Sequence, residues 1–320
     1  MSEQPSSQLK VFAGRSNVPL AESICRYLGI GLGKAACETF ADGELFVKLH
    51  EDVRGADVYI VQSTCRPVNE NLMELLIFID CVRRASARRI TAVLPYFGYA
   101  RQDRKDEGRT PITAKLVCNL IVSAGATRVL ALDLHAAQIQ GFFDIPMDHL
   151  LAEPVLTRHF RERYTQSPVF VSPDVGNIKR VRLYAQRVGG DLAIIDKRRV
   201  NDRQAEVENV IGDVEGRDVL MIDDMIATAG TVTEAAKIVR RFGAKRVCVA
   251  ATHAVLCGPA FERLEKAPID DITVTDTIPV SEEARRRLPR MKVLSVSELL
   301  GEAIRRIHRN ESVSSLFLKS

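Results

Sequence analysis

Two adjacent carboxylates, Asp223 and Asp224, follow an apolar run in the stretch VLMIDDMIATAGT, residues 219–231. The turn Thr228–Thr231 comes next, with two hydroxyls and a glycine, before a segment of helical period. A strand end, such a turn and a helix start aim several backbone N–H groups at one point, where the helix dipole favours an anion. Because adjacent acids repel a phosphate unless they face hydroxyls or a cation, the pattern predicts a ribose 5-phosphate site. The alternative is structural, with acids that only cap a helix and cover a strand end.

Other groups with chemical potential also follow expected strands, where a parallel sheet presents its ligand groups. His135 stands beyond the apolar run 129–134, and imidazole is a plausible ligand for a divalent metal. Asp174 follows a short strand in the same way. The polar loop that begins at Lys197 is long enough to fold over a bound substrate. The charged run Tyr99–Lys105 is by composition an ordinary solvated surface, and a lone histidine is more often structural.

The elements that position these residues alternate between short β-branched runs and longer stretches of helical period. After the acid pair, one predicted helical face carries Val232, Ala235, Ala236, Val239 and Phe242, and Thr231 with Glu234 has capping-box spacing. The repeated pattern predicts an α/β fold in which helices flank a mostly parallel sheet. The expected strands are 9–13, 57–62, 89–95, 128–134, 169–173, 191–196, 218–223, 246–252, 271–275 and 292–296.

An internal repeat indicates two domains. The segment 53–62 resembles 214–223, and each is followed by a helix and then by Ala87–Ile90 or Ala244–Val247 opening another strand. The first copy continues Gln62-Ser-Thr-Cys-Arg and lacks the acid pair, so only the second copy keeps the site. We place the junction near Leu150–Pro154, which predicts domains at 1–150 and 151–306 and a tail at 307–320.

Composition excludes several classes of protein. The 320 residues carry 45 basic and 41 acidic side chains, a net charge of +4, which favours neither a nucleic-acid partner nor a membrane surface. No apolar stretch reaches the roughly 18 residues that cross a bilayer, and the first ten residues do not resemble a signal peptide, so we expect a cytoplasmic protein. The seven scattered cysteines predict buried thiols rather than a disulfide framework.

Gly29–Lys34 approaches a Walker phosphate loop but does not match it. Its first glycine is one residue too close to the Gly33-Lys34 pair, and Ala35 replaces the metal-binding serine or threonine. We therefore do not expect a phosphate cradle there.

The stretch 219–231 resembles the phosphoribosyl pyrophosphate loop of type I phosphoribosyltransferases and of ribose-phosphate pyrophosphokinases. The segment DLHAAQIQGFFDIPMD, Asp133–Asp148, matches the signature of the ribose-phosphate pyrophosphokinases almost throughout, and phosphoribosyltransferases lack it. The resemblance runs from about Lys10 to Phe317. It implies two tandem phosphoribosyltransferase-like domains, with a nucleotide side and a degenerate sugar-phosphate loop in the first, and the ribose 5-phosphate loop and a catalytic flexible loop in the second.

The resemblance also implies roles for residues at matching positions. Lys197 and Arg199 correspond to the catalytic cations, and His135 and Asp174 to metal positions. The expected ribose 5-phosphate ligands are Asp223, Asp224, Thr228, Ala229, Gly230 and Thr231. The expected ATP contacts are Arg101, Gln102 and His135, together with Phe40, Asp42 and Glu44 reaching a neighbouring subunit. Locally, Phe40–Glu44 fits an ordinary Asp-Gly hairpin turn equally well.

The implied activity is transfer of the diphosphoryl group of Mg-ATP to the anomeric hydroxyl of ribose 5-phosphate. The products would be AMP and 5-phosphoribosyl 1-pyrophosphate, which supplies nucleotide, histidine and tryptophan biosynthesis. The resemblance implies Mg²⁺ as cofactor, a homo-oligomer in the form of a hexamer built from dimers, and phosphate and ADP as effectors. The expected effector site comprises Gln140, Asp148, Ser312 and Ser314.

Three departures from the usual family pattern bear on these roles. Ala227 stands where many relatives carry an aspartate, which predicts weaker ribose 5-phosphate binding. Ala137 replaces a frequent hydroxyl residue near the effector site, and Asn177 replaces a glycine. Two alternatives stay open. A phosphoribosyltransferase would use the same sugar-phosphate loop without the 101–102 and 135 segments, and a catalytically silent regulatory partner would make no AMP.

Overall fold

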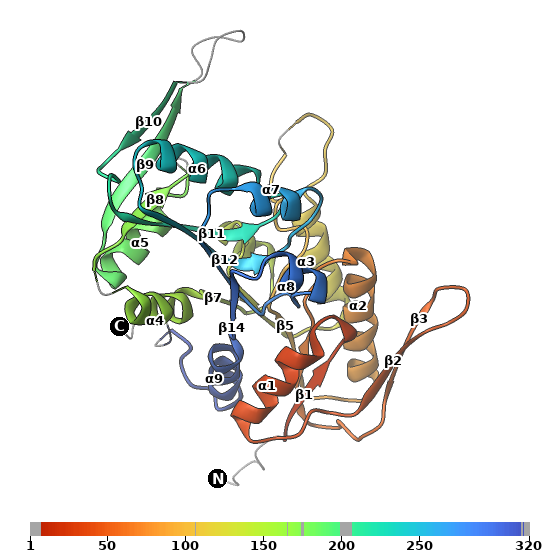
Figure 1. The fold of residues 1–320 in the computed structure, drawn as a ribbon. Helices are drawn as coiled ribbons and strands as arrows, with labels where there is room; N and C mark the ends of the chain where they lie inside the picture. The colour runs from red at the N-terminus through yellow and green to blue at the C-terminus, as the bar shows by residue number, and fades with distance from the viewer. Residues whose placement is uncertain are drawn as a thin grey trace. The chain divides into compact units, whose positions relative to one another are not determined.

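The computed structural model describes residues 8–105, 107–164, 166–173, 176–198, 207–314 and 316, with only the backbone for 197, 198, 207 and 208. The chain forms two compact units (Figure 1). Unit 1 contains the described residues up to Ala152, Thr277–Pro279 and those from Ser295 onward. Unit 2 contains Glu153–Asp276 and Val280–Leu294. The division after Ala152 falls in the predicted junction, whereas residues 295–306 belong to unit 1 and differ from the predicted second range.

Unit 1 is built on a five-stranded parallel sheet of order β1-β4-β5-β6-β7. These strands are β1 (Leu9–Ala13), β4 (Asp57–Val61), β5 (Arg89–Leu94), β6 (Arg128–Leu132) and β7 (Met147–Leu150). An antiparallel hairpin of β2 (Ala35–Thr39) and β3 (Leu45–Leu49) extends away from that sheet (Figure 1). The helices are α1 (Val18–Leu28), α2 (Val68–Arg84), α3 (Thr113–Ala124) and α9 (Ser297–His308), with short 3-10 turns η1 (Arg15–Asn17) and η2 (Ala137–Phe142).

The core of unit 1 explains its central strand. Every residue of β4 is buried, as expected for a parallel strand covered on both faces. Phe12 of β1 meets Phe78 of α2 edge to face, with ring centroids 5.8 Å apart. Gly33 packs against the Phe12 ring and donates its N–H to the Val11 carbonyl at 2.7 Å. Since this glycine lies between a helix and a strand, its segment lacks the strand-to-helix setting of a phosphate loop.

Unit 2 contains a seven-stranded sheet of order β10-β9-β8-β11-β12-β13-β14, parallel except for the antiparallel β10-β9 edge. Its strands are β8 (Val169–Ser172), β9 (Asp191–Arg198), β10 (Val207–Ile211), β11 (Asp218–Ile226), β12 (Arg246–Ala254), β13 (Asp271–Thr275) and β14 (Met291–Leu294). Its helices are α4 (Glu153–Arg163), α5 (Ile178–Val188), α6 (Gly230–Arg241), α7 (Ala260–Lys266) and α8 (Glu282–Arg287).

The central strand β11 is buried on both faces. Val219 and Met221 belong to the core that includes α6 and α7, whereas Leu220 and Ile222 belong to the core that includes α4 and α5. This alternation follows from the period of two along a strand. The parallel, doubly covered sheet predicted from the sequence is therefore confirmed.

All ten predicted strands are present, and β1 and β13 have the predicted bounds. The other eight differ at an end by up to three residues, and β2, β3, β7 and β10 were not predicted. On α6, Val232, Ala235, Ala236 and Val239 are buried as predicted, but Phe242 is 39% exposed beyond the helix end.

The predicted capping box is wrong. Helix α6 begins at Gly230, so Thr231 lies inside its first turn, and no side chain caps it. The cap position is Ala229, in a left-handed conformation with φ of 60°.

All seven cysteines are free thiols, and Cys25, Cys65, Cys118 and Cys248 are buried. Among the helices in the described ranges, none combines the length and apolar character that a membrane span requires.

Candidate functional site

The acid pair lies within β11 rather than at its end, because the strand continues to Ile226. Pairing with β12 continues through Asp223 opposite Ala251 to Ile226 opposite Ala254, which fixes both carboxylates on a rigid strand. Asp223 is half-buried and Asp224 is 5% exposed. The Asp224 backbone N–H donates to Asp223 Oδ1 at 2.8 Å.

This setting makes Asp223 hard to ionise. Burial, followed by a hydrogen bond to the neighbouring Asp224 carboxyl and the negative charge of that carboxyl, raises the pKa of Asp223 to a net value of about 7. The Asp224 N–H and the Arg180 guanidinium act in the opposite direction. A bound cation, or sugar hydroxyls that donate to the pair, would relieve this repulsion. The chemistry predicted from the sequence therefore has a physical basis in the unliganded site.

The turn after β11 is held in place by the chain that follows β12. The N–H groups of Leu256 and Cys257 donate to the carbonyls of Ile226 and Ala227 at 2.9 and 3.0 Å. Helix α6 then starts at Gly230, and its first amides have no partner within the helix. With the exposed hydroxyls of Thr228 and Thr231, these amides form a donor-rich helix start suited to a phosphate.

Two neighbours of this turn were not predicted as site residues. Arg263 of α7 donates from Nη1 to the Thr228 carbonyl at 3.1 Å, which places a guanidinium beside the turn. Asn177 donates from Nδ2 to the Ile222 carbonyl at 2.7 Å, one residue before the acid pair. The sequence could have identified Asn177 as a site residue, because it replaces a glycine of the family pattern. It could not have identified Arg263, which lies 35 residues after Thr228 in an ordinary charged helix.

In unit 1, the Arg101–Gln102 loop and the His135 segment follow the neighbouring strands β5 and β6. A hydrogen bond of 2.6 Å from Gln138 Nε2 to Asp103 Oδ2 joins the two segments. Gln102 accepts at Oε1 from the Thr113 hydroxyl at 2.5 Å, while Arg101 is exposed. The segments that contain Arg101, Gln102 and His135 thus follow the carboxyl ends of two neighbouring strands, whereas Phe40, Asp42 and Glu44 lie on the separate β2–β3 hairpin.

His135 is exposed just beyond a tightly held strand end. Asp133, with φ of 41°, accepts the Ala152 N–H at Oδ2 at 2.9 Å. The Leu134 N–H donates to Nε2 of His149 at 2.9 Å. Within the described ranges, no three histidine, cysteine or acidic side chains gather as a metal cage.

The Phe40–Glu44 segment is the tip of the β2–β3 hairpin. The N–H of Phe40 donates to the Glu44 carbonyl at 2.8 Å, and Gly43 takes φ of 95°, so the hairpin interpretation is confirmed. Phe40 is 51% exposed, and its ring centroid lies 5.5 Å from that of Phe46. Asp42 and Glu44 are exposed as well. Their role at a subunit interface stays a prediction.

The predicted catalytic cations lie at the limit of what is described. The Lys197 backbone continues β9, opposite Glu208 of β10, whereas Arg199 and Asp174 fall outside the described residues. Among the predicted effector residues, Asp148 pairs with Arg128 at 2.6 Å, and Gln140 donates to the Ala137 carbonyl at 2.9 Å. Ser312 accepts at its carbonyl from Arg306 at 3.0 Å, and Ser314 is exposed.

The strand-borne acid pair, the left-handed turn and the helix start define a phosphoribosyltransferase-like α/β fold. The chain belongs to the ribose-phosphate pyrophosphokinase family. A family profile described as the N-terminal domain of ribose phosphate pyrophosphokinase matches residues 9–125, and one described as the phosphoribosyl synthetase-associated domain matches residues 199–318.

Relatives and a solved structure carry this assignment. Ribose-phosphate pyrophosphokinases of Rhodopirellula baltica and Gloeobacter violaceus are 59% and 55% identical to this chain. Each alignment covers 97% of this chain, with 98% of the first relative and 93% of the second. The crystal structure of phosphoribosylpyrophosphate synthetase from Mycobacterium smegmatis superposes with a TM-score of 0.89 at 43% identity, over 95% of this chain and all of that one. The fold and family predicted from the sequence are therefore confirmed.

Proposed function

We propose that this protein transfers the diphosphoryl group of Mg-ATP to the anomeric hydroxyl of ribose 5-phosphate, yielding 5-phosphoribosyl 1-pyrophosphate and AMP. The observation that carries the proposal is the partly buried acid pair on strand β11 beside a donor-rich helix start, in a chain of this family. Transfer to ribose explains both features, because the pair accepts sugar hydroxyls while the helix start holds the 5-phosphate.

The sugar side is assigned to unit 2. Asp223 and Asp224 would accept hydrogen bonds from the ribose hydroxyls. These hydrogen bonds would reduce the free-energy cost of burying two adjacent carboxylates. The turn 228–231 would hold the 5-phosphate through backbone amides and the two threonine hydroxyls. Ala227 offers no side-chain acceptor where relatives carry aspartate, so we expect a raised KM for ribose 5-phosphate.

The nucleotide side is assigned to Arg101, Gln102 and His135, which lie on two segments that follow the neighbouring strands β5 and β6 and are linked by the Gln138–Asp103 hydrogen bond. Magnesium would arrive as the Mg-ATP complex. Mg²⁺ commonly keeps several waters and binds substrate phosphates plus one or two carboxylates, so it does not require a full protein cage. His135 and Asp174 are the candidate protein ligands. Phe40, Asp42 and Glu44 would reach the adenine of a neighbouring subunit in a hexamer.

The chemical step needs little covalent work from the protein. The anomeric oxygen bonds to the β-phosphorus as the bond from that phosphorus to the α-phosphate oxygen breaks, and AMP leaves. Lys197 and Arg199 would stabilise the charge that develops on the transferring phosphates. Their loop follows β9 and would close over the substrates.

The proposal extends to the effectors of the protein and to its place in the cell. Phosphate and ADP are proposed as effectors at Gln140, Asp148, Ser312 and Ser314, with Ala137 removing a hydroxyl from that region. A cytoplasmic location fits the sequence, and the product would supply nucleotide, histidine and tryptophan biosynthesis.

The test is formation of AMP from ATP and ribose 5-phosphate by the purified protein with Mg²⁺ and phosphate present. Asp223→Asn should lower turnover about a hundredfold or more, since lost charge-assisted hydrogen bonds cost about 1.5–3 kcal/mol each. Asp213→Asn changes an exposed acid of the same unit and serves as the matched control.

Two outcomes would contradict the proposal. No AMP from the wild-type protein would favour a silent regulatory partner. Consumption of phosphoribosyl pyrophosphate with a nucleobase, without use of ATP, would favour a phosphoribosyltransferase.

A further inference from the structure

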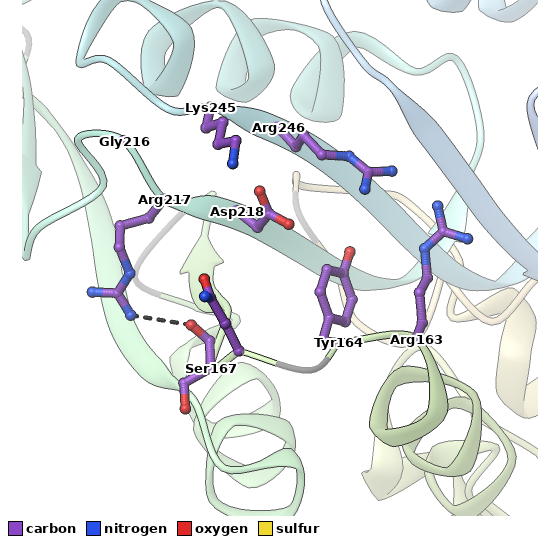
Figure 2. Close-up of a pocket in the computed structure, with 9 residues that line it drawn as sticks. Arg163, Tyr164, Ser167, Gly216, Arg217, Asp218, Lys245 and Arg246 are labelled. Atoms are coloured by element: carbon purple, nitrogen blue, oxygen red, sulfur yellow. Dashed lines mark hydrogen bonds between the residues drawn. The ribbon is translucent and has the colours of Figure 1, made fainter.

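A small polar pocket of about 210 Å³ opens at the start of the parallel strands of unit 2 (Figure 2). It lies between the end of α4, the segment before β8 and the first residues of β11 and β12. The acid pair is on the same strand, but Asp223 follows Asp218 by five residues, or about 17 Å at 3.3 Å per residue. The pocket is therefore separate from the proposed ribose site. It is lined by Arg163, Tyr164, Gln166, Ser167, Gly216, Arg217, Asp218, Lys245 and Arg246.

The pocket carries an excess of positive charge. Arg163 and Arg246 share one carboxylate, Asp271, at 2.6 and 2.5 Å. Arg217 pairs with Asp191 at 2.7 Å and also donates to the Ser167 carbonyl at 3.1 Å. Lys245 has no ion-pair partner in the described part of the chain. Counting Asp218, four cations face three carboxylates, so an anion would be attracted.

Two groups of the pocket lack the partners that buried or charged groups normally have. The Asp218 carboxylate makes no ion pair within the described ranges, because Arg246 is engaged by Asp271. The Tyr164 hydroxyl oxygen is buried and makes no hydrogen bond of ordinary geometry among the described residues, although the Cys248 thiol, a weak acceptor, lies beside it. Burial raises the pKa of Tyr164, with the adjacent Cys248 thiol adding to the shift, so this hydroxyl keeps its proton as a donor. A ligand that satisfies both groups must offer an acceptor and a donor.

The corresponding aspartate and arginine of unit 1 show which groups bind to such a pair. In unit 1, Asp57 pairs in register with Arg89, as Asp218 pairs with Arg246 in unit 2. There the C-terminal segment supplies both kinds of group. Arg89 donates to Asn310 Oδ1 at 2.9 Å and to the His308 carbonyl at 3.2 Å, while His308 Nδ1 lies 2.8 Å from Asp57 Oδ2. Oxygens thus meet the arginine, and an N–H meets the aspartate.

We propose that the unit 2 pocket binds inorganic phosphate. Its oxygens would accept from Lys245, Arg246 and the Tyr164 hydroxyl, and its remaining proton would be donated to the Asp218 carboxylate. Phosphate keeps a P–OH group at neutral pH, whereas sulfate has none, so Asp218 selects phosphate over sulfate. The volume of about 210 Å³ is below the range of about 300–1,000 Å³ for larger organic ligands, which favours a small ion.

The test is calorimetric titration of the full-length protein with inorganic phosphate, at fixed ionic strength in a buffer free of other oxyanions. The wild-type protein should show a binding component that Lys245→Gln weakens about tenfold or more, the loss expected for one charge-assisted hydrogen bond. Lys237→Gln is the matched control, because this exposed lysine of the same unit already pairs with Glu234 at 2.8 Å. Identical phosphate binding in the wild type and Lys245→Gln would overturn the proposal.

A second variant tests the choice of anion. Wild-type protein should bind phosphate more tightly than sulfate in the Lys245-dependent component. Asp218→Asn should lose that preference, since an amide can donate to a fully deprotonated anion. Sulfate bound as tightly as phosphate by the wild-type protein would refute the role of Asp218. Neither measurement depends on turnover, so the outcome is independent of the proposed reaction.

Discussion

Replacing Asp223 with asparagine should stabilise the unliganded protein while it removes activity. Asparagine keeps an oxygen for the Asp224 N–H, which now donates at 2.8 Å, but it carries no charge. In the wild type, burial and the adjacent Asp224 carboxylate oppose the ionisation of Asp223. If the pair served only as a helix cap, removing the charge would weaken the protein. The two interpretations therefore predict opposite signs.

The magnitude follows from the pKa. A shift from 3.8 to about 7 corresponds to at most about 4.5 kcal/mol at about 1.4 kcal/mol per pKa unit, and partial exposure reduces the expected gain to about 1–3 kcal/mol. A carboxyl whose pKa is raised on folding favours the folded state below its unfolded pKa, and this contribution is lost as pH rises through the folded value. The gain in Asp223→Asn should therefore be larger at pH 8 than at pH 5.

Urea unfolding followed by far-ultraviolet circular dichroism, at matched protein concentration and without ligands, measures this difference. Comparing the variant with the wild type at each pH cancels the titration of all other groups. Asp213→Asn, at an exposed acid, should show no gain at either pH. A variant at Asp223 that is less stable than the wild type at pH 8, or equally changed at both pH values, would refute strain in the pair.

Four further predictions test other parts of the molecule. Lys197→Ala should lower turnover about a thousandfold or more with a modest change in stability, as measured by steady-state kinetics beside thermal unfolding. Arg263→Ala removes the guanidinium beside the phosphate turn, so KM for ribose 5-phosphate should rise about tenfold with little change in kcat. Gly33→Ala would press a methyl group into the Phe12 ring and should cost about 1–3 kcal/mol in urea unfolding, without a specific effect on ATP binding. Asp57→Ala leaves a partly buried arginine and a histidine without their shared carboxylate, and should lower the free energy of unfolding by about 3 kcal/mol.

The sequence predicted the parallel sheets well because their strands are continuous apolar runs. β1 and β13 have the expected bounds. The Asp-Gly turn at Phe40–Glu44 was predicted, but its strands β2 and β3 were not, since their residues are mostly half-exposed and only Val47 is buried, so no apolar run marks them. β7 was not predicted because it is only four residues long and contains the polar residues Asp148 and His149, so it has no apolar run.

The site was predictable in composition but not in geometry. Asp223 and Asp224 were expected at the end of a strand, yet β11 continues to Ile226 because β12 pairs with it there. The helix start moved to Gly230 since Ala229 adopts a left-handed conformation, which local capping rules do not foresee for alanine. Arg263 reaches the turn from another helix, and such a contact depends on tertiary packing alone.

The last helix of the chain has a consequence for biosynthesis. α9 packs on α1, with Gly301 against the Tyr27 ring and Leu300 and Ile304 fully buried. Residues 297–308 must therefore be synthesised before unit 1 can acquire this helix, although α1 precedes them by more than 260 residues. A nascent chain that stops short of α9 would leave the apolar side of α1 that α9 covers exposed to solvent.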